Sequence, residues 1–393
     1  MKLNFNFIAM ALLFPLLLTG QNKEGQIEAI IKEYLSPNSP GLAIMATQNK
    51  EVLYENAFGW SDMETGEKIQ PKDLFRVGSI TKQFTATAIL KLAHEKKLGL
   101  EDSINKYFPN STSGEKITIK HLLQHTSGLG NQSDIPEFGN DNIDLSNYPR
   151  DMIQPILNSA LRFSPGTDYA YSNLGYVVLG YIIERVSGMS YEGYLKKTFF
   201  EPLDMNNTGF EYIDDDKTPK SKGYSMVKGE YEEASPLEMK IAYSAGGLVS
   251  NLHDLEKWNR AIMKGDVLPS SFVSQLQEAS VLPDGKPTGY SYGWQIGNIQ
   301  GLKTVKHDGI VNGFTSMAIY IPESDVFIIT LSNCDCFRDI ELPASKIAAL
   351  LVNKPFPSQS IELPILKPTL VGSSIWILAP FTDSAWVTQP SHC

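Results

Sequence analysis

Residues 79–99 read SITKQFTATAILKLAHEKKLG, and this pattern predicts a long helix that begins inside the protein. Small or apolar residues lie on nearly every side of the helix as far as Leu92. The sequence then becomes polar and reaches Gly99, a residue type that commonly ends helices. A helix that is apolar all round in its first turns must be covered by other elements. We therefore expect the rest of the chain to pack around it.

Strand patterns lie near both ends of the chain, with helical patterns between them. Strands are predicted at 42–47, 51–58, 292–296, 314–321 and 326–332. Helices are predicted at 27–35, 119–124, 152–161, 174–186, 191–200 and 253–263. The economical arrangement is an α+β fold, in which a central antiparallel sheet flanked by helices forms an α/β lobe and an all-α lobe is inserted in the middle.

We place the α/β lobe at about 25–90 and 240–353 and the helical lobe at about 91–239. A cleft between two such lobes is the usual place for a ligand or a reaction. The main domain would therefore occupy 21–353 and hold its site between the lobes.

The two ends of the chain differ from this domain. Lys2 followed by the apolar stretch 7–18 is typical of a signal peptide, here covering 1–20. The apolar stretch is short for a membrane span and a proline interrupts it, so a retained anchor is the weaker interpretation. We expect a periplasmic or secreted protein with no stable membrane anchor after signal removal. The proline-rich segment 354–393 is a tail without a convincing element.

Composition excludes several functions. A net charge of −10 without a run of Lys or Arg argues against nucleic acid as a partner. The three cysteines, Cys334, Cys336 and Cys393, gather at one end and cannot be a disulfide framework for a domain of this size. No Cys/His group has zinc spacing, and His121 and His125 lack the glutamate of an H-E-x-x-H motif. We expect neither a metal nor a cofactor.

Ser79 and Lys82 share one face at the start of the long helix. A serine attacks only when a base takes its proton, and an amine can be that base where burial and a helix N-terminus lower its pKa. The same S-x-x-K spacing occurs at Ser103/Lys106, Ser113/Lys116 and Ser225/Lys228. Ser79 is favoured because Gly78 precedes it and only this copy starts a long apolar helix. In the alternative, Ser79 only caps the helix.

Tyr171-Ser172-Asn173 lies just before the helix predicted at 174–186, so a loop displays its side chains. A phenol beside a cationic lysine can relay a proton, and an amide can hold Lys82 and bind a substrate carbonyl. Tyr54-Glu55-Asn56 has the same Y-x-N spacing. Because Tyr54 lies in a predicted strand, a packing role suits it better.

His307-Asp308-Gly309 precedes the strand predicted at 314–321 and is the only H-x-G in the chain. Gly309 and Gly313 remove side chains where a substrate could lie against backbone. A lone histidine is more often structural, so this motif counts only in combination. The acidic loop at 130–150 could select cationic substrates, although a solvated loop is the simpler interpretation.

The order S-x-x-K, Y-S-N, H-D-G resembles the superfamily of serine hydrolases that contains penicillin-binding proteins and class C β-lactamases, with their esterase and D-amino-acid peptidase branches. The resemblance covers about 27–351. It includes the stretches FRVGSITKQFTA, HLLQHTSGL, FSPGTDYAYSNLGYVVLGYIIERVSG and EPLDMNNTGF. It implies a β-lactamase/transpeptidase-like fold with Ser79 as the acylated nucleophile.

The same resemblance assigns roles to the other residues. Lys82 and Tyr171 share base and acid duties, and Asn173 positions Lys82 and the substrate. His307 and Gly309 line an edge strand against which the substrate lies, and the N–H groups of Ser79 and Ile310 form the oxyanion hole. Which of the two shared groups takes the first proton stays open, because coupled groups do not titrate separately.

Two departures affect the expected substrate. Many β-lactamases of this superfamily have a lysine where His307 stands, and a mostly neutral imidazole attracts a substrate carboxylate less. Lowering the pH towards 6 is expected to charge it. The E-x-x-L-N pattern of class A enzymes is also absent, so deacylation must use Tyr171, Lys82 or the substrate itself.

The expected function is therefore an exported hydrolase of small-molecule esters, amides or D-amino-acid peptides. One alternative is a β-lactamase proper, and another is a penicillin-binding sensor that acylates with little turnover. A third is a scaffold with an idle site, against which the intact set Ser79, Lys82, Tyr171 and Asn173 argues.

Overall fold

The computed structural model describes residues 23–114, 116–135, 145–337 and 339–354. The predicted signal peptide and all but the first residue of the predicted tail lie outside these ranges. Within them, no helix is both long enough and apolar enough to span a bilayer.

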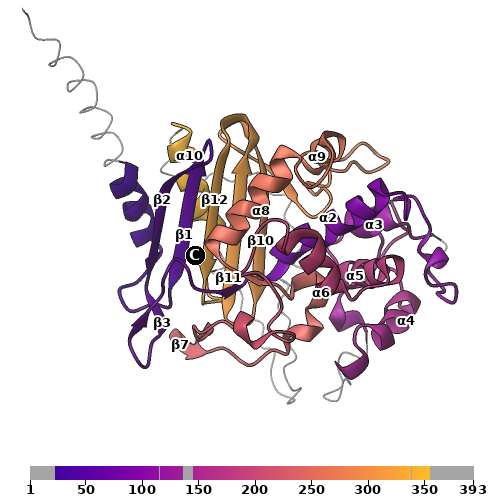
Figure 1. Cartoon of the computed structure of the whole chain (residues 1–393), viewed down its shortest axis with the longest axis horizontal. Helices are drawn as coiled ribbons and strands as arrows, with labels where there is room; N and C mark the ends of the chain where they lie inside the picture. The colour runs from indigo at the N-terminus through magenta and orange to yellow at the C-terminus, as the bar shows by residue number, and fades with distance from the viewer. Residues whose placement is uncertain (1–22, 115, 136–144, 338, 355–393) are drawn as a thin grey trace, which may run out of the picture.

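One antiparallel sheet of six strands, in the order β2-β1-β12-β11-β10-β9, forms the centre of the molecule (Figure 1). Its strands are β1 (Leu42–Gln48), β2 (Glu51–Phe58), β9 (Gln295–Ile299), β10 (Leu302–Val311), β11 (Phe314–Ile321) and β12 (Val326–Ser332). The early and late parts of the chain meet where β1 pairs with β12, with Leu42 opposite Ser332. The prediction of one sheet built from both ends is confirmed.

The remaining elements surround this sheet. The helices are α2 (Thr81–His94), α3 (Ile119–Leu123), α4 (Arg150–Asn158), α5 (Asn173–Ser187), α6 (Tyr191–Leu195), α7 (Tyr243–Gly246), α8 (Leu252–Lys264), α9 (Ser270–Leu276) and α10 (Glu341–Leu351), with a further helix at 23–32. Short strand pairs are β3 (Trp60–Asp62) with β4 (Glu67–Lys68), β5 (Phe75–Arg76) with β8 (Val249–Ser250), and β6 (Tyr224–Val227) with β7 (Glu230–Glu233).

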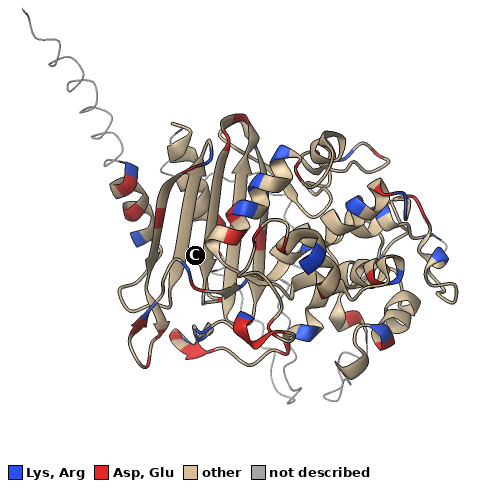
Figure 2. Ribbon diagram, in the orientation of Figure 1, with Lys and Arg blue, Asp and Glu red and all other residues tan. Residues whose placement is uncertain are grey.

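Helices cover both faces of the sheet. On one face, Ile27 of the first helix and Ile347 of α10 belong to the same apolar cluster as Ile319 and Ile328 of the sheet. On the other face, α2 and α8 pack together, and the rings of Phe84 and Trp258 are stacked with centroids 3.9 Å apart. The central strands β11 and β12 are buried along their whole length and carry no charged residue (Figure 2). The layers confirm the predicted α+β class.

Helix α2 joins the sheet to the helical part of the molecule. It is buried as far as Leu90, so the prediction of a helix that starts in the core is confirmed. Helices α3 to α6 lie on the side away from β1 and β2 (Figure 1). The contact between α5 and α7 is close, because a Cβ atom on Gly180 would lie 2.1 Å from Oγ of Ser244.

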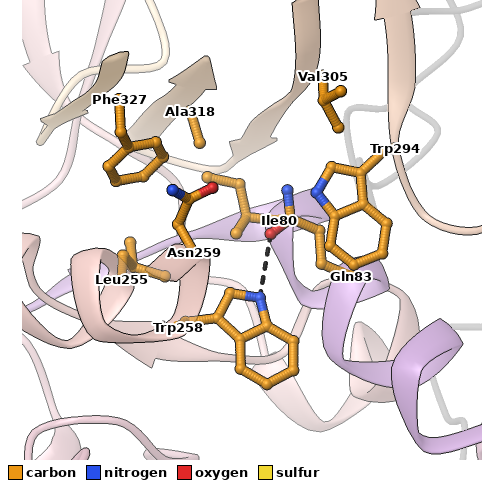
Figure 3. A pocket seen from close by; sticks show the side chains of 9 residues that line it. All are labelled: Ile80, Gln83, Leu255, Trp258, Asn259, Trp294, Val305, Ala318 and Phe327. Carbon is orange, nitrogen blue, oxygen red and sulfur yellow. Dashed lines mark hydrogen bonds between the residues drawn. The ribbon is translucent and has the colours of Figure 1, made fainter. Parts of the chain in front are cut away.

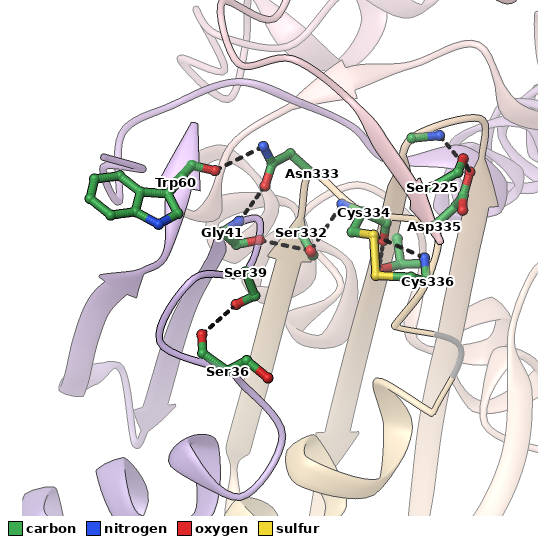
Figure 4. The surroundings of a disulfide bond; sticks show 12 residues. Ser36, Ser39, Gly41, Trp60, Ser225, Ser332, Asn333, Cys334, Asp335 and Cys336 are labelled. Atoms are coloured by element: carbon green, nitrogen blue, oxygen red, sulfur yellow. Dashed lines mark hydrogen bonds between the residues drawn. A yellow bond between two sulfur atoms is a disulfide. The ribbon is translucent and has the colours of Figure 1, made fainter. Parts of the chain in front are cut away.

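A local disulfide between Cys334 and Cys336 follows β12 (Figure 4). Because the two cysteines are two residues apart, the bond does not join distant elements. The neighbouring Asn333 instead makes hydrogen bonds to parts of the chain that are distant in sequence. Its side chain accepts a hydrogen bond from the Gly41 N–H at 2.5 Å and donates to the carbonyl oxygens of Trp60 and Lys222.

Candidate active site

Ser79 lies in a single 3₁₀ turn, Gly78–Ile80, that leads directly into α2. The α-helix begins two residues later than the sequence predicted, because Ser79 and Ile80 belong to the tighter 3₁₀ turn. Gly78 has a φ of +50°, and a Cβ atom there would lie 2.9 Å from the backbone nitrogen of Ile310. Glycine is therefore needed for the turn and for the approach of β10.

The amine of Lys82 is fully buried and has three oxygen atoms around it. Its Nζ lies 3.0 Å from Oγ of Ser79, 2.8 Å from Oδ1 of Asn173 and 2.7 Å from the carbonyl oxygen of Ala245. Two of these oxygens can only accept hydrogen bonds. A neutral amine can satisfy both with its two protons, which leaves its lone pair for the serine O–H. The geometry therefore fits a lysine that takes the proton of Ser79.

Burial lowers the pKa of Lys82 well below its usual value. The carboxylate of Asp308 acts in the opposite direction but has the smaller effect. Loss of solvent disfavours the charged form of an amine. The environment of Lys82 thus favours the form that can act as a base.

The Y-S-N motif lies at the start of α5, on the helical side of Ser79. Ser172 caps this helix by accepting a hydrogen bond from the Gly175 N–H, and Asn173 is its first residue. The ring centroid of Tyr171 lies 4.8 Å from Nζ of Lys82. Burial raises the pKa of Tyr171 well above its usual value, although a hydrogen bond with Ser79 partly offsets this effect. Tyr171 is therefore a neutral phenol beside Ser79.

Strand β10 brings the third motif to the same place. β9 pairs only with its first half, from Leu302 to Lys306, so the half from His307 to Val311 has a sheet partner on the β11 side alone. A Cβ atom on Gly309 would lie 2.1 Å from the Val77 carbonyl oxygen and 2.9 Å from the Ser79 nitrogen. The free edge of the sheet therefore runs directly beside Ser79, and it includes Ile310.

His307 is enclosed rather than open to the surroundings, with 1% of its surface exposed. Its Nδ1 lies 2.6 Å from the carbonyl oxygen of Asp308, which can only accept, so Nδ1 carries the proton. Nε2 then accepts from the hydroxyl of Tyr290 at 2.9 Å. Burial lowers the pKa of His307 to about 4. The expectation that pH 6 charges this histidine is therefore wrong for this environment.

Three groups at the site were missed from the sequence. The Ala245 carbonyl binds Lys82, as described above. The side chain of Asn131 donates to the Tyr171 carbonyl oxygen at 3.2 Å and accepts from the Asn173 N–H at 2.9 Å. His125 lies beside Tyr171, with ring centroids 4.3 Å apart. Backbone carbonyls carry no sequence signal, whereas His125 and Asn131 fall in or next to the HTSGL stretch that the resemblance had included.

The competing copies of the motifs have other partners. Lys106 binds the carboxylate of Asp102 at the surface. Ser225 donates to Asp335 at 2.6 Å, and Lys228 three residues later is exposed. Tyr54 packs in the cluster on the far face of the sheet. None of these residues has an arrangement like that around Ser79.

Two further predictions concern charge and metals. Of the acidic residues in the loop at 130–150, Asp134 binds Arg162 in an ion pair, and Glu137, Asp141 and Asp144 lie outside the described residues. In the part of the chain that the structure describes, no group of three His, Cys, Asp or Glu side chains could hold a metal ion.

A separate cavity adjoins the other side of α2 and is not part of this site (Figure 3). Gln83, the residue after Lys82, lines it and accepts a hydrogen bond from Nε1 of Trp258 at 3.2 Å. The cavity holds about 10 Å³, which is room for about one water molecule. Helix α2 therefore directs Lys82 towards Ser79 and Gln83 towards Trp258 of α8.

Comparison with known proteins gives a consistent result. The family model for Beta-lactamase matches residues 27–349. Protein flp of Staphylococcus aureus strain MRSA252 is 30% identical over 326 residues, which are 80% of this chain and 64% of that protein. This chain thus spans less than two thirds of the length of that relative. Penicillin-binding protein 4* of Bacillus subtilis strain 168 is 27% identical over 361 residues, covering 86% of this chain and 78% of that protein.

Solved structures share the fold. The octameric penicillin-binding protein homologue from Pyrococcus abyssi superimposes with a TM-score of 0.73 at 30% identity, over 84% of this chain and 78% of the other. A D-stereospecific amidohydrolase from Streptomyces sp. gives a TM-score of 0.66 at 26% identity, over 80% of this chain and 94% of the other. With a family match over most of its length, the chain belongs to the beta-lactamase family, within the superfamily that contains penicillin-binding proteins and β-lactamases.

Proposed function

We propose that this protein hydrolyses esters, amides or D-amino-acid peptides through an acyl-enzyme on Ser79. The observation that carries the proposal is the Lys82 amine, which is fully buried, 3.0 Å from Oγ of Ser79 and otherwise bound only to acceptors. Burying an amine without a carboxylate partner lowers the stability of the folded protein. A role as the base for a serine nucleophile therefore explains its position better than a role in stability does.

In acylation, the Ser79 proton passes to neutral Lys82 while Oγ bonds to the substrate carbonyl carbon. The carbonyl oxygen becomes an oxyanion, and the N–H groups of Ser79 and Ile310 are the proposed donors to it. The intermediate collapses when the leaving alcohol or amine takes a proton from the lysine through the Tyr171 phenol. We assign the first proton to Lys82 because the pKa of Tyr171 is raised and that of Lys82 is lowered.

Deacylation repeats these steps with water. Lys82, again neutral, takes a proton from the water, whose oxygen attacks the ester carbonyl. The acid departs and Ser79 regains its proton. Asn173 holds Lys82 in place through its Oδ1 at 2.8 Å throughout.

The substrate class follows from the charges near Ser79. His307 stays neutral and both its ring nitrogens are bound, so it offers no fixed cation to a carboxylate. Among the described residues, Asp308 is the acidic group that acts on both Lys82 and Tyr171, and its negative charge repels anions. Neutral esters and amides, or substrates with a free amine, fit these charges better than penicillins do. Similarity to a D-stereospecific amidohydrolase agrees with this choice.

A second candidate is a penicillin-binding protein that acylates with little turnover, which the similarity to penicillin-binding protein 4* favours. One assay separates the two. Purified protein and its Ser79→Ala variant are tested on p-nitrophenyl acetate, a D-amino-acid amide, a D-Ala-D-Ala peptide and a chromogenic cephalosporin. Multiple turnovers that disappear in the variant support hydrolysis, whereas a single stoichiometric burst supports the binding protein.

We also propose that the protein is exported. The N-terminal sequence pattern supports this, and the Cys334–Cys336 disulfide agrees with an oxidising compartment. N-terminal sequencing of the protein recovered from its host tests the proposal. A first residue near 21 supports export, and retention of residues 1–20 contradicts cleavage there.

A further inference from the structure

We propose that His125 is a positioning residue, which holds Tyr171 so that its phenol can protonate a poor leaving group. This inference rests on the proposed function. His125 itself does not contact Ser79 or Lys82 through any hydrogen bond. Its effect would pass entirely through the loop that carries Tyr171.

His125 holds the backbone on both sides of Tyr171. Its carbonyl oxygen accepts from the Ala170 N–H at 3.0 Å, and its Nδ1 accepts from the Ser172 N–H at 3.1 Å. These two bonds fix the residue before Tyr171 and the residue after it. His125 itself has a φ of +57°, a left-handed conformation that costs energy for a residue with a side chain. This left-handed conformation of His125 is retained despite its cost, and it brings the imidazole to the Y-S-N motif.

The ring of His125 also packs directly on the phenol. Its centroid lies 4.3 Å from that of Tyr171 and 4.5 Å from that of Tyr290. Since Nδ1 accepts a hydrogen bond, the proton of the neutral ring is on Nε2. This buried nitrogen has no hydrogen-bond partner among the described residues. A histidine kept only for stability would be expected to use both nitrogens, as His307 does.

The surroundings hold this imidazole in its neutral form. Burial, Lys82 and His307 all lower its pKa well below the usual value, and its other near neighbours are the phenols of Tyr171, Tyr176 and Tyr290. Protonation would remove the acceptor for the Ser172 N–H and place a cation near Lys82. The neutral ring thus keeps the acceptor for the Ser172 N–H and adds no charge to the site.

Two variants of His125 each remove one of its two contacts, either the hydrogen bond from the Ser172 N–H or the ring packing on Tyr171. His125→Phe keeps a ring beside Tyr171 and removes the acceptor for the Ser172 N–H. His125→Asn keeps an acceptor and suits a left-handed φ, but removes the ring. His121→Asn is the matched control, because Nδ1 of His121 also accepts a backbone N–H, that of Thr118, at the far end of α3. Tyr171→Phe shows what loss of the phenol alone does.

The readout is kcat/KM for two acetate esters. The leaving group of p-nitrophenyl acetate departs as a stable anion, whereas that of ethyl acetate must be protonated. We expect both His125 variants to lose about 10- to 100-fold on ethyl acetate and less than about 5-fold on p-nitrophenyl acetate. Tyr171→Phe should show the same bias, and His121→Asn should change neither rate. Thermal unfolding identifies any variant that has not folded.

The proposed function and the positioning role of His125 can be contradicted separately. If the wild type hydrolyses neither these esters nor any substrate of the panel above, or still hydrolyses them after Ser79→Ala, the proposed function is contradicted and the inference falls with it. If the wild type is active but both folded His125 variants lose the same factor on the two esters, the positioning role alone is contradicted.

Discussion

Gly309 of β10 lies against the turn that carries Ser79, so closely that a Cβ atom on Gly309 would be 2.9 Å from the Ser79 nitrogen and 2.1 Å from the Val77 carbonyl oxygen. Two stretches of backbone more than two hundred residues apart thus meet without an intervening side chain. The relationship brings the backbone of β10 close to Ser79, where we propose that the N–H groups of Ser79 and Ile310 form the oxyanion hole.

Gly309→Ala should therefore lower kcat/KM for p-nitrophenyl acetate by about 100-fold, because β10 must move away from Ser79 and one oxyanion donor is lost. Gly297→Ala in β9 is the matched control. The atoms nearest to its added Cβ belong to the side chains of Thr304 and Lys306, which can move. Equal effects of the two substitutions would show that the close contact has no catalytic importance.

Lys82→Arg should lose nearly as much activity as Lys82→Ala. Arginine keeps the positive charge but does not deprotonate in proteins, so it cannot take the Ser79 proton. Steady-state rates on p-nitrophenyl acetate, with circular dichroism to verify folding, measure this. A Lys82→Arg variant within about 10-fold of the wild type would assign the base to Tyr171 or to another group.

Of the four serines in S-x-x-K spacing, only Ser79 should be essential. Ser79→Ala should abolish hydrolysis. Ser103→Ala, Ser113→Ala and Ser225→Ala should retain rates within about 2-fold of the wild type if they fold, since Ser103 caps a surface turn and Ser225 binds Asp335. A comparable loss of activity in any folded variant of these three sites would move the nucleophile elsewhere.

Substrate preference should not respond to pH near neutrality. With a pKa of about 4, His307 is neutral at both pH 8 and pH 6, so the ratio of kcat/KM for p-nitrophenyl acetate to that for a cephalosporin should stay constant. Both rates should fall together towards acid pH as Lys82 becomes protonated. His307→Lys supplies the missing charge and should shift the ratio about 10-fold towards the cephalosporin at each pH. A ratio that changes between pH 8 and 6 in the wild type would mean that His307 titrates there.

Most of the fold could be predicted from the sequence, because the hydrophobic and turn patterns that indicate helices and strands are local. β11 and β12 begin and end at the predicted residues, 314–321 and 326–332, since the Pro322 to Asp325 turn separates two uncharged, largely apolar runs. β10 was not predicted as a strand from its residues. Its sequence, LKTVKHDGIV, contains three charged residues, and its side chains alternate between buried and partly exposed positions, so it lacks the continuous apolar run of β11 and β12.

The site was harder to predict because its chemistry depends on burial. The spacing of Ser79 and Lys82 is visible in the sequence, but the complete burial of the Lys82 amine is not. The case of His307 is similar, since its lowered pKa follows from enclosure and from its bond to Tyr290, a residue that nothing in the sequence linked to it. Contacts with backbone carbonyls, such as that of Ala245 with Lys82, leave no pattern at all.

The most direct test of the account is to trap the acyl-enzyme and locate it. The protein is mixed with p-nitrophenyl acetate or a slowly released β-lactam, quenched in acid, digested and analysed by mass spectrometry. The account predicts one acyl group per chain, on the peptide that contains Ser79, and none in Ser79→Ala. An acyl group on another residue of the wild type, or equal labelling of Ser79→Ala, would contradict it.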